Sequence, residues 1–431
     1  MTDLNIVIVT YNWPPRNAIG THRPYAWARY WSEAGARVTV LTAQKQPFDE
    51  PLDLDLPLIE GVKVIEVSSS SAMSLIGWLF KSPGMRRVAR KAKAWLGRRS
   101  AIAAEPRMSW RGAAKSTVEQ LASDADVVVS TFGPSAAHLI GYDMKMANPN
   151  LFWVADYRDL WSQRHTAPVS EDVRESERSM EQNSVGARAD LLTAVSKDMV
   201  NQLAAFLDEE TLELPNGFDI NKEDIPQALS KRPSKPDGPM RIVYTGMIYE
   251  GHQDPTPLLE ALAALHEKEK LAIGQVTVDF YGARVDLAKR LAQNPAYAPF
   301  IRLMGHVTRD EALLAQRSAG FLLLLESPAP EARGVLTGKL FEYMAAGRPI
   351  MCLGSRPEYE IGNVLRVTGT GQVFGPDEYQ LLEPLVLKTL EGDGLYRDYD
   401  ANIEEVLKYS RKKQSEEFLE VLVTKLESRS K

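Results

Sequence analysis

The sequence contains very little cysteine. Cys352 is the only cysteine among 431 residues, which excludes a disulfide within the chain. Because disulfides are concentrated in secreted proteins, a single thiol favours a cytoplasmic location. One cysteine and six scattered histidines also offer poor material for a zinc site, so we predict no metal and no required cofactor.

An excess of basic residues and long apolar runs are also lacking. The chain has 57 acidic and 51 basic residues, for a net charge of −6. A protein that neutralises nucleic-acid phosphates needs surplus Lys and Arg, so nucleic acid is not an expected partner. No apolar run is long enough to cross a bilayer, and the acidic start M-T-D-L-N does not resemble a signal peptide. We therefore expect a soluble protein.

The composition is otherwise ordinary for a globular protein, and the length exceeds what one hydrophobic core usually serves. In the first half, apolar strand-like runs alternate with helical stretches. This β-α-β order predicts a parallel sheet with right-handed crossovers. The expected strands lie at residues 6–10, 38–42, 62–67, 127–131, 151–155 and 190–195.

A second series of the same kind follows a segment rich in proline and charge. Its expected strands lie at residues 242–245, 276–281, 301–304, 321–325 and 350–353. The sequence therefore predicts an α/β protein with two Rossmann-like domains. We expect an N-terminal domain over residues 1–219, a linker over 220–239, a C-terminal domain over 240–401 and a last helix over 402–431.

The loop T-Y-N-W-P-P-R-N-A-I-G-T-H-R-P, residues 10–24, leaves the first strand at its carboxyl end. Ligands bind parallel sheets at this edge. Gly20 would allow a close approach, and Arg16, His22 and Arg23 are placed to meet an anion. An ordinary strand–helix loop is the alternative interpretation.

A second charged segment, A-D-Y-R-D-L-W, follows the strand predicted at residues 151–155. It places Asp156, Arg158 and Asp159 just past a strand's carboxyl end, where charged side chains often serve a site. Asp159 is the candidate catalytic carboxylate near an acceptor hydroxyl, with Asp156 and Arg158 positioning it. The alternative is a local Asp–Arg ion pair that only holds the loop.

The segment G-V-L-T-G-K-L-F-E-Y-M-A-A-G-R-P, residues 334–349, predicts a short amphipathic helix after the strand at 321–325. Gly338, Lys339 and Glu342 share one face near its N-terminus. Free N–H groups and a lysine suit a phosphate, and a carboxylate can accept two ribose hydroxyls. A solvent-facing Lys–Glu pair is the equally plain alternative.

Residues 74–115 carry eleven basic residues and one acid, Glu105, which gives +10 locally. An apolar cluster that includes Trp78, Leu79 and Phe80 precedes the basic run. A basic amphipathic stretch with aromatic residues indicates attachment to an anionic membrane surface. The alternative is a solvated helix whose charges only maintain solubility.

Taken in order, these motifs resemble the retaining glycosyltransferases of family four, which have the GT-B fold with two facing Rossmann-like domains and a central cleft. The likeness covers most of the chain and also includes T-A-V-S-K, P-N-G-F-D and Y-T-G at residues 244–246. It is strongest to bacterial enzymes of surface polysaccharide synthesis. The resemblance implies an N-terminal acceptor domain, a C-terminal sugar-nucleotide domain, and a last helix that crosses back to the N-terminal domain.

The resemblance also implies roles for individual residues. Glu342 matches the glutamate that holds the donor ribose, and Lys339 would lie near the diphosphate. The other implied donor contacts are Gly20 facing the phosphates across the cleft, Gly246 in the first loop of the donor domain, and the backbone at His306 and Val307 beside the nucleobase. Gly338 is a candidate from its position at the helix N-terminus, where it would let a phosphate approach the backbone.

The sequence departs from the family pattern at two places. Many members have a second glutamate eight positions before Glu342, where this chain has Gly334, and Glu331 or Glu326 is a possible substitute. Many members also have an Arg and a Lys after the first C-terminal strand. This chain has M-I-Y-E-G-H there, so Lys339, Arg333 or the N-terminal loop must meet the phosphate charge.

The leading hypothesis is therefore an enzyme that moves a sugar from a UDP- or GDP-sugar to a hydroxyl of a lipid-linked or polysaccharide acceptor, with retention. We expect it in the cytoplasm, peripherally attached to the inner face of the cell membrane. A sugar-nucleotide epimerase of the same fold and a non-catalytic scaffold that binds nucleotide sugars are the alternatives.

Overall fold

The computed structural model describes residues 4–68, 106–163, 170–219, 229 and 231–429. The chain divides into two compact units, which are described separately. The first unit combines Met1–Pro215 with Arg411–Lys431, and the second comprises Asn216–Ser410.

The first unit is built on a seven-stranded parallel sheet with strand order β3-β2-β1-β4-β5-β6-β7. Its central strands are buried on both faces, which explains their continuous apolar sequences. The strands are β1 (Asn5–Val9), β2 (Arg37–Ala43), β3 (Lys63–Val67), β4 (Val127–Thr131), β5 (Phe152–Tyr157), β6 (Leu191–Ala194) and β7 (Thr211–Glu213).

Helices cover both faces of this sheet. Ile6 and Ile8 of β1 pack in one core with α1 (His22–Glu33) and α18 (Arg411–Arg429). Val7 and Val9 point into the other core, with α5 (Ser109–Asp124), α6 (Ala136–Ala147) and α8 (Lys197–Leu207). α7 (Glu171–Glu181) precedes β6 in the chain. Successive residues of β1 therefore belong to two different cores, one on each face of the sheet.

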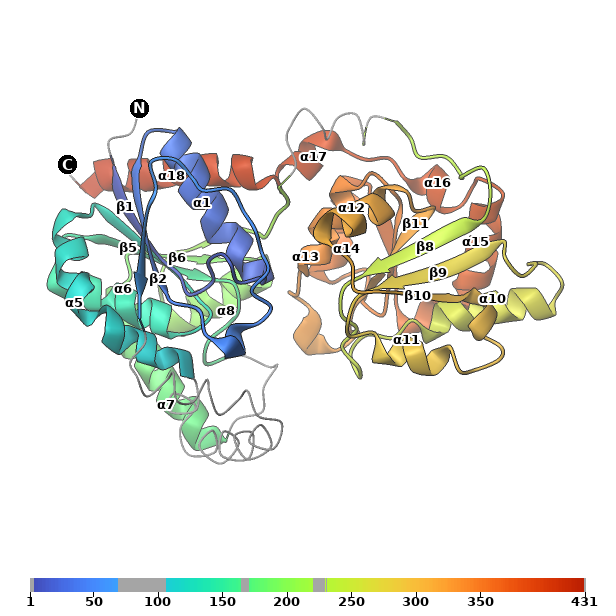
Figure 1. Cartoon of the computed structure of the whole chain (residues 1–431), viewed down its shortest axis with the longest axis horizontal. Coiled ribbons are helices and arrows are strands. Elements are labelled where there is room, and N and C mark those ends of the chain that lie inside the picture. Colours follow the sequence, from blue (N-terminus) through green and yellow to red (C-terminus); the bar gives the residue numbers. More distant parts are fainter. Residues whose placement is uncertain (1–3, 69–105, 164–169, 220–228, 230, 430–431) are drawn as a thin grey trace. The chain divides into compact units, whose positions relative to one another are not determined.

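A cluster of aromatic side chains packs the C-terminal helix, α18, against α1 of the first unit. Trp27 and Trp31 of α1 stack with ring centroids 5.6 Å apart, and Phe418 of α18 lies 5.6 Å from each. The indole N–H of Trp31 donates to the carbonyl of Ser415 at 2.8 Å. Figure 1 shows α18 alongside α1 although nearly 400 residues separate them in the chain.

The end of the chain differs from the single helix that we expected from about residue 402 to 428. The structure has α17 (Ile403–Leu407), a break at residues 408–410, and then α18. Val406 of α17 lies in a core of the second unit, whereas Phe418 lies in a core of the first. The helix is interrupted because its two parts bury their apolar residues against different cores.

The second unit has a six-stranded parallel sheet with strand order β10-β9-β8-β11-β12-β13. β7 and β13 are not among the strands predicted from the sequence. They lie at sheet edges and are not fully buried, so their sequences lack an apolar run. The strands are β8 (Met240–Thr245), β9 (Val276–Tyr281), β10 (Ile301–Gly305), β11 (Phe321–Leu325), β12 (Ile350–Leu353) and β13 (Gly371–Phe374).

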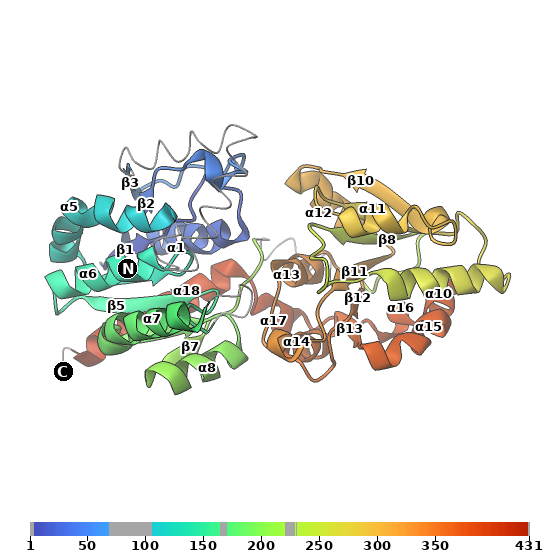
Figure 2. The same ribbon diagram turned by 90° about the horizontal axis from the view of Figure 1, so that it is seen from below.

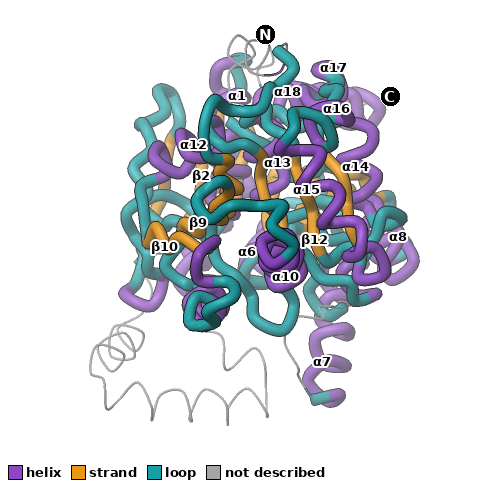
Figure 3. The backbone as a smooth tube through the Cα atoms, turned by 90° about the vertical axis from the view of Figure 1, so that its right-hand side faces the viewer, coloured by secondary structure: helices purple, strands orange, loops and turns teal. Residues whose placement is uncertain are grey.

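Helices also enclose the second sheet on both faces, as the secondary-structure colouring of Figure 3 and the view in Figure 2 show. One core contains α10 (Thr256–Glu267), α11 (Asp286–Leu291), α15 (Leu382–Leu390) and α16 (Leu395–Asp398). The opposite core contains α12 (Arg309–Arg317), α13 (Gly338–Ala345), α14 (Glu360–Thr368) and α17.

The boundary between the units falls within the P-N-G-F-D turn. Phe218 is buried in the second unit, and its N–H donates to the carbonyl of Tyr409 at 3.0 Å. The division therefore comes a few residues earlier than the end at 219 that the sequence predicts, because this side chain belongs to the second core.

Most of the basic segment predicted to face a membrane, residues 74–105, lies outside the described residues. Two of its described members have acidic partners. Arg107 contacts Asp49 at 3.0 Å, and Arg111 forms a two-pronged ion pair with Asp143 at 2.7 and 2.8 Å. Acids from elsewhere in the chain thus offset part of the local +10. No helix among the described residues has the length and apolarity needed to span a bilayer.

Candidate functional site

Arg158 lies against two glycines at the carboxyl edge of the first sheet. A Cβ on Gly20, in the one-turn helix η1 (Ile19–Thr21), would come within 1.7 Å of the Arg158 guanidinium. A Cβ on Gly133, which has a φ of +107°, would come within 2.5 Å of it. The guanidinium donates to the carbonyl of Phe132 at 2.6 and 3.1 Å. The glycines therefore permit a cation to sit directly on the loop backbone.

The sequence predicts that Asp156 lies just past the end of a strand. In the structure Asp156 lies within β5. Its carboxylate is buried and accepts four hydrogen bonds, two from Arg23 at 2.6 and 3.2 Å and one each from Thr131 and Thr193 at 2.7 Å. Burial alone would raise the pKa of Asp156, but Arg23 and the two hydroxyls outweigh it and hold the pKa below its ordinary value.

The same ion pair changes the interpretation of Arg23. The sequence places Arg23 in a loop that could meet an external anion, but the side chain is buried and its anion is Asp156. It also donates to the carbonyl of Pro215 at 2.9 Å. Arg23 therefore links α1 to β5 and to Pro215, the last residue of the N-terminal segment of the first unit.

Asp159 is exposed on the loop that follows β5. The buried carboxylate of Glu181 holds this loop in place. It accepts a hydrogen bond from the Tyr157 hydroxyl at 2.9 Å and another from the N–H of Ser162 at 3.1 Å. Asp156 fixes the strand before Asp159, and Glu181 fixes the loop around it. The exposed carboxylate thus lies on a well-supported backbone beside the Arg158 charge.

In the second unit, Lys339 of α13 reaches the loop after β8. Its amine donates to the Tyr244 hydroxyl at 3.0 Å and to the carbonyl of Met247 at 3.3 Å, and it lies 4.9 Å from the Tyr244 ring centroid. A Cβ on Gly246, whose φ is +105°, would come within 2.7 Å of the Lys339 chain. Burial lowers the pKa of Lys339. The structure thus brings together Gly246, Gly338 and Lys339.

Glu342, one turn further along α13, points to a different neighbour. Its carboxylate lies 3.5 Å from the guanidinium of Arg309, and 32% of its side chain is exposed. The ion pair at this position is therefore with α12 rather than with Lys339. A half-exposed pair of this length is easily exchanged for hydrogen bonds to a ligand.

His306 and Val307 form the connection between β10 and α12. His306 is exposed, and Val307 is half-buried against the core around α13. Gly305 has a φ of +76° and turns the chain out of the strand, and its carbonyl accepts from Gly282 at 2.7 Å. Thr308 then caps α12 by accepting from the N–H of Glu311. This backbone is exposed at the same sheet edge as the loop at Gly246.

The structure distinguishes between the two glutamates that might replace the one missing at Gly334. Glu331 is exposed in the short helix η6 (Pro330–Ala332), whereas Glu326 is buried at the end of β11. The Thr337 hydroxyl donates to Glu326 at 2.8 Å. Burial raises the pKa of Glu326 to about 7, although Thr337 and Lys339 act in the opposite direction.

This shift predicts a dependence of stability on pH. Between pH 4.5, the ordinary pKa of a glutamate, and about pH 7, the Glu326 carboxyl is largely ionised in the unfolded chain but still protonated in the folded chain. The free energy of unfolding should therefore fall as pH rises through this range, by about 3 kcal/mol in total. Glu326→Gln, which keeps the acceptor for Thr337, should remove this fall.

The measurement is denaturant unfolding of both proteins at pH 5 and pH 8. The variant should gain stability relative to wild type as pH rises. An equal pH dependence in the two proteins would show that Glu326 titrates normally.

A hollow of about 210 Å³ adjoins the Gly246 loop. It is smaller than the roughly 300–1,000 Å³ of most small-molecule sites. Its lining residues are Met247, Ile248, Tyr249, Glu250, Arg284, Asp286 and Leu287. Among the described parts of the chain, no group of three or more His, Cys, Asp or Glu side chains gathers in a way that would hold a metal ion.

No protein-family model and no curated protein matches this chain. Solved structures do. Sucrose-phosphate synthase from Thermosynechococcus elongatus has a TM-score of 0.62 at 15% identity, covering 99% of this chain and 100% of that one. An α,α-trehalose-phosphate synthase (UDP-forming) from Burkholderia vietnamiensis has a TM-score of 0.61 at 9% identity, with coverage of 99% and 100%.

A further similar structure is trehalose-6-phosphate from E. coli bound with UDP-2-fluoro glucose, with a TM-score of 0.60, 12% identity, and coverage of 97% of this chain and 98% of that one. These identities are too low to carry activity from one protein to another, but the likeness extends over essentially the whole length. The predicted GT-B fold, with two Rossmann-like units, is therefore confirmed.

Proposed function

We propose that this chain is a glycosyltransferase that takes its sugar from a nucleoside diphosphate donor, a UDP- or GDP-sugar. The observation that carries the proposal is the convergence of Lys339, Gly338 and Gly246 at the edge of the second sheet, with Glu342 one turn away. Lysine and free helix N–H groups suit a diphosphate, and a carboxylate suits the hydroxyls of a ribose.

The chemistry required of this site is electrostatic. When the sugar leaves, the nucleoside diphosphate gains negative charge, and preorganised donors stabilise that charge best. Lys339 and the first N–H groups of α13 are such donors. We assign the place of the missing glutamate at Gly334 to Glu326, because its buried carboxyl adjoins Lys339 and carries a proton for part of the time at neutral pH.

The acceptor side of the proposal lies in the first unit. Asp159 is the carboxylate that takes the proton of the acceptor hydroxyl, and Arg158 and Asp156 position it. Following the resemblance in sequence, we propose transfer with retention to a lipid-linked or polysaccharide acceptor in bacterial surface polysaccharide synthesis. Gly20, beside Arg158, is proposed to contact the donor phosphates.

Thermal unfolding of the full chain with UDP, GDP, dTDP and their common sugars tests the donor class. A ligand at 100 times its dissociation constant stabilises the native state by about 2.7 kcal/mol, which is a shift of several degrees. No shift with any nucleotide would overturn the proposal. Conversion of the bound donor without an acceptor would instead favour an epimerase, and binding without transfer to any acceptor would favour a scaffold.

Glu342→Gln is predicted to weaken binding of the identified nucleotide by about 1.5–3 kcal/mol per lost hydrogen bond to the charged carboxylate. Calorimetry on the full chain measures this affinity. Glu383→Gln is the matched control, because Glu383 also forms an ion pair, with Lys268, and its side chain is 33% exposed against 32% for Glu342. Equal affinity in the Glu342→Gln variant and the control would contradict the ribose assignment.

We also propose peripheral attachment to an anionic membrane through the basic residues that precede Arg107 in the sequence. Each Lys or Arg near such a surface contributes about 1 kcal/mol, and the attraction is screened by salt. The chain should float with anionic liposomes but not with neutral ones. Replacing Arg86, Arg87, Arg90 and Lys91 with Gln should abolish flotation and leave nucleotide binding intact. Equal flotation with neutral liposomes would contradict the proposed attachment to an anionic membrane.

A further inference from the structure

One tyrosine in the second unit lies against Lys339 and the loop that follows β8. Tyr244 belongs to β8, and its side chain is fully buried. The Lys339 amine donates to the Tyr244 hydroxyl at 3.0 Å and lies 4.9 Å from the centroid of the Tyr244 ring. The tyrosine therefore contacts this lysine both through its hydroxyl and through its ring.

The hydrogen of the Tyr244 hydroxyl has a partner of its own. The hydroxyl oxygen lies 2.5 Å from the Met247 carbonyl and 3.3 Å from the side-chain oxygen of Gln253. A tyrosine hydroxyl has one hydrogen to donate, and its oxygen can accept from another group at the same time. The hydrogen therefore goes to the nearer carbonyl, and the oxygen accepts from the ammonium of Lys339.

The loop that carries Met247 is held in place by a buried glutamine. The side-chain oxygen of Gln253 accepts from the N–H of Tyr249 at 3.0 Å. In this conformation the Met247 carbonyl also accepts from Lys339, at 3.3 Å. The segment M-I-Y-E-G-H, residues 247–252, lacks the Arg and Lys that are common in the family. It provides Lys339 with an acceptor instead.

Lys339 keeps one N–H for a ligand. An ammonium has three N–H donors, and within the described part of the chain two of them are accepted, by Tyr244 and by Met247. Both acceptors are neutral, so the positive charge remains available to an anion. A lysine side chain has many rotamers, and holding it in place before a ligand arrives removes part of the entropy cost of binding. These contacts thus prepare Lys339 in the first turn of α13.

The surroundings of Lys339 act on its charge in both directions. Burial lowers the pKa of Lys339, whereas the carboxylates of Glu326, at the end of β11, and Glu342, on α13, act to raise it. A hydrogen-bond acceptor that contacts the ammonium directly also stabilises the charged form. Removal of the Tyr244 hydroxyl should therefore lower the pKa of Lys339 further.

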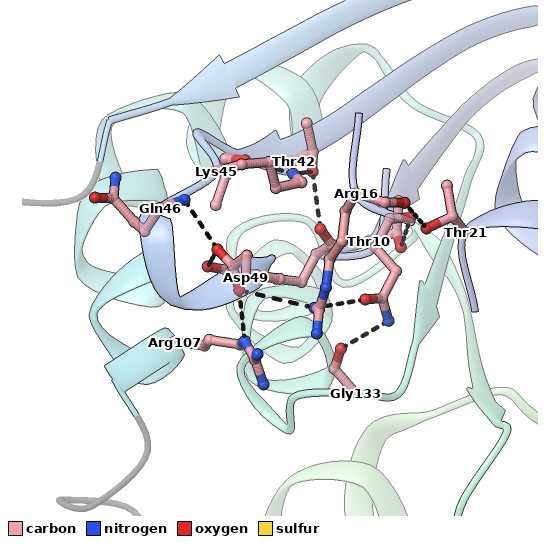
Figure 4. Close-up of polar contacts among 12 residues, drawn as sticks. Thr10, Arg16, Thr21, Thr42, Lys45, Gln46, Asp49, Arg107 and Gly133 are labelled. Atoms are coloured by element: carbon pink, nitrogen blue, oxygen red, sulfur yellow. Dashed lines mark hydrogen bonds and ion pairs between the residues drawn. The ribbon is translucent and has the colours of Figure 1, made fainter. Parts of the chain in front are cut away.

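A tyrosine beside a cation does not by itself indicate such a role. In the first unit, the Lys45 amine lies 5.3 Å from the centroid of the Tyr11 ring. The Tyr11 hydroxyl, however, donates to the buried carboxylate of Asp49 at 2.8 Å. Figure 4 shows that Arg107 is also directed at Asp49, so a carboxylate organises that cluster. At Tyr244 the hydroxyl bonds to the cation itself.

We propose that Tyr244 is a positioning residue for Lys339, whose ammonium it holds at the N-terminus of α13 where the diphosphate of the donor binds. The reference to a donor rests on the proposed function. Because Tyr244 is fully buried, it acts through Lys339 and does not contact the donor. The hydrogen bond is present without a ligand, so it can also be tested without one.

The pH dependence of Lys339 acetylation in the ligand-free full chain tests this hydrogen bond. Only the neutral amine reacts with acetic anhydride, so labelling of the Lys339 peptide, measured by mass spectrometry, follows the ionisation of the amine. Tyr244→Phe should move the midpoint of the labelling curve to lower pH. A general loosening of the structure would speed labelling equally at every pH and leave the midpoint in place. An unchanged or higher midpoint would overturn the proposal.

Tyr396→Phe is the matched control. Tyr396 lies in the same core as Tyr244, is also buried, and donates its hydroxyl hydrogen to the carbonyl of Gly320 at 2.9 Å. Both variants keep the aromatic ring and lose one buried hydroxyl that donates to a main-chain carbonyl. Only Tyr244→Phe removes an acceptor from Lys339. The control should keep the wild-type midpoint, and an equal shift in both variants would also overturn the proposal.

A double-mutant cycle with UDP and GDP measures the effect on the proposed donor site. Tyr244→Phe should weaken binding of the recognised nucleotide about tenfold, because a hydrogen bond to a charged group is lost. In a Lys339→Met background the same change should have no further effect. An equal loss in both backgrounds would show that Tyr244 does not act through Lys339. If neither nucleotide binds to wild type, the proposed function fails, and the labelling midpoint still decides whether Tyr244 positions Lys339.

Discussion

Asp159→Asn is expected to reduce the rate of glycosyl transfer by about two to four orders of magnitude, the usual range for loss of a general base. An amide cannot take the proton of an acceptor hydroxyl, but it preserves the size of the side chain. Donor affinity should stay near that of wild type, because the donor contacts proposed at Lys339 and Glu342 are untouched. Single-turnover kinetics with the identified donor and acceptor measure the effect.

The stability of this variant should change little, because the Asp159 side chain is exposed. Asp172→Asn provides a matched control, since Asp172 is also an exposed aspartate of the first unit and lies on α7. Its transfer rate should equal that of wild type. A folded Asp159→Asn protein with wild-type turnover would remove Asp159 from the proposed mechanism.

Asp156→Asn should instead destabilise the fold, by about 3–5 kcal/mol. The substitution leaves the buried Arg23 guanidinium without a counter-charge. It also places an amide N–H₂ among groups that donate to the present carboxylate, Arg23, Thr131 and Thr193. Urea unfolding of the variant and of wild type gives the difference directly.

A double variant, Arg23→Gln with Asp156→Asn, identifies the cause. If the cost arises from the uncompensated charge of Arg23, the double variant should recover part of the stability lost in Asp156→Asn. A loss below about 1 kcal/mol in the single variant, the size typical of an exposed pair, would show that the ion pair is weak despite its burial.

Asp156 and Asp159 lie three residues apart, and the sequence alone treats them alike. Both belong to A-D-Y-R-D-L-W, and both follow the predicted strand. In the structure β5 extends to Tyr157. Asp156 therefore lies within the strand with a buried side chain, whereas Asp159 lies on the loop that follows the strand. A shift of two residues in a strand boundary separates a structural carboxylate from a candidate catalytic one, and periodicity does not locate boundaries that finely.

The local pattern of the sequence determined the fold class. Phe321–Leu325 is a strand as predicted, because five consecutive apolar residues are stable there only when both faces are covered. The helix after it contains Gly338, Lys339 and Glu342 as their spacing required. Such features depend on neighbours within a few residues, so composition and periodicity are enough to find them.

Only the tertiary structure decided which charges meet. Arg23 finds Asp156 across 133 residues, and Arg107 finds Asp49 across 58. The raised pKa of Glu326 likewise comes from burial beneath other segments. Electrostatic energies depend on distance and on the removal of water, and both are set by packing between elements that no local spacing records.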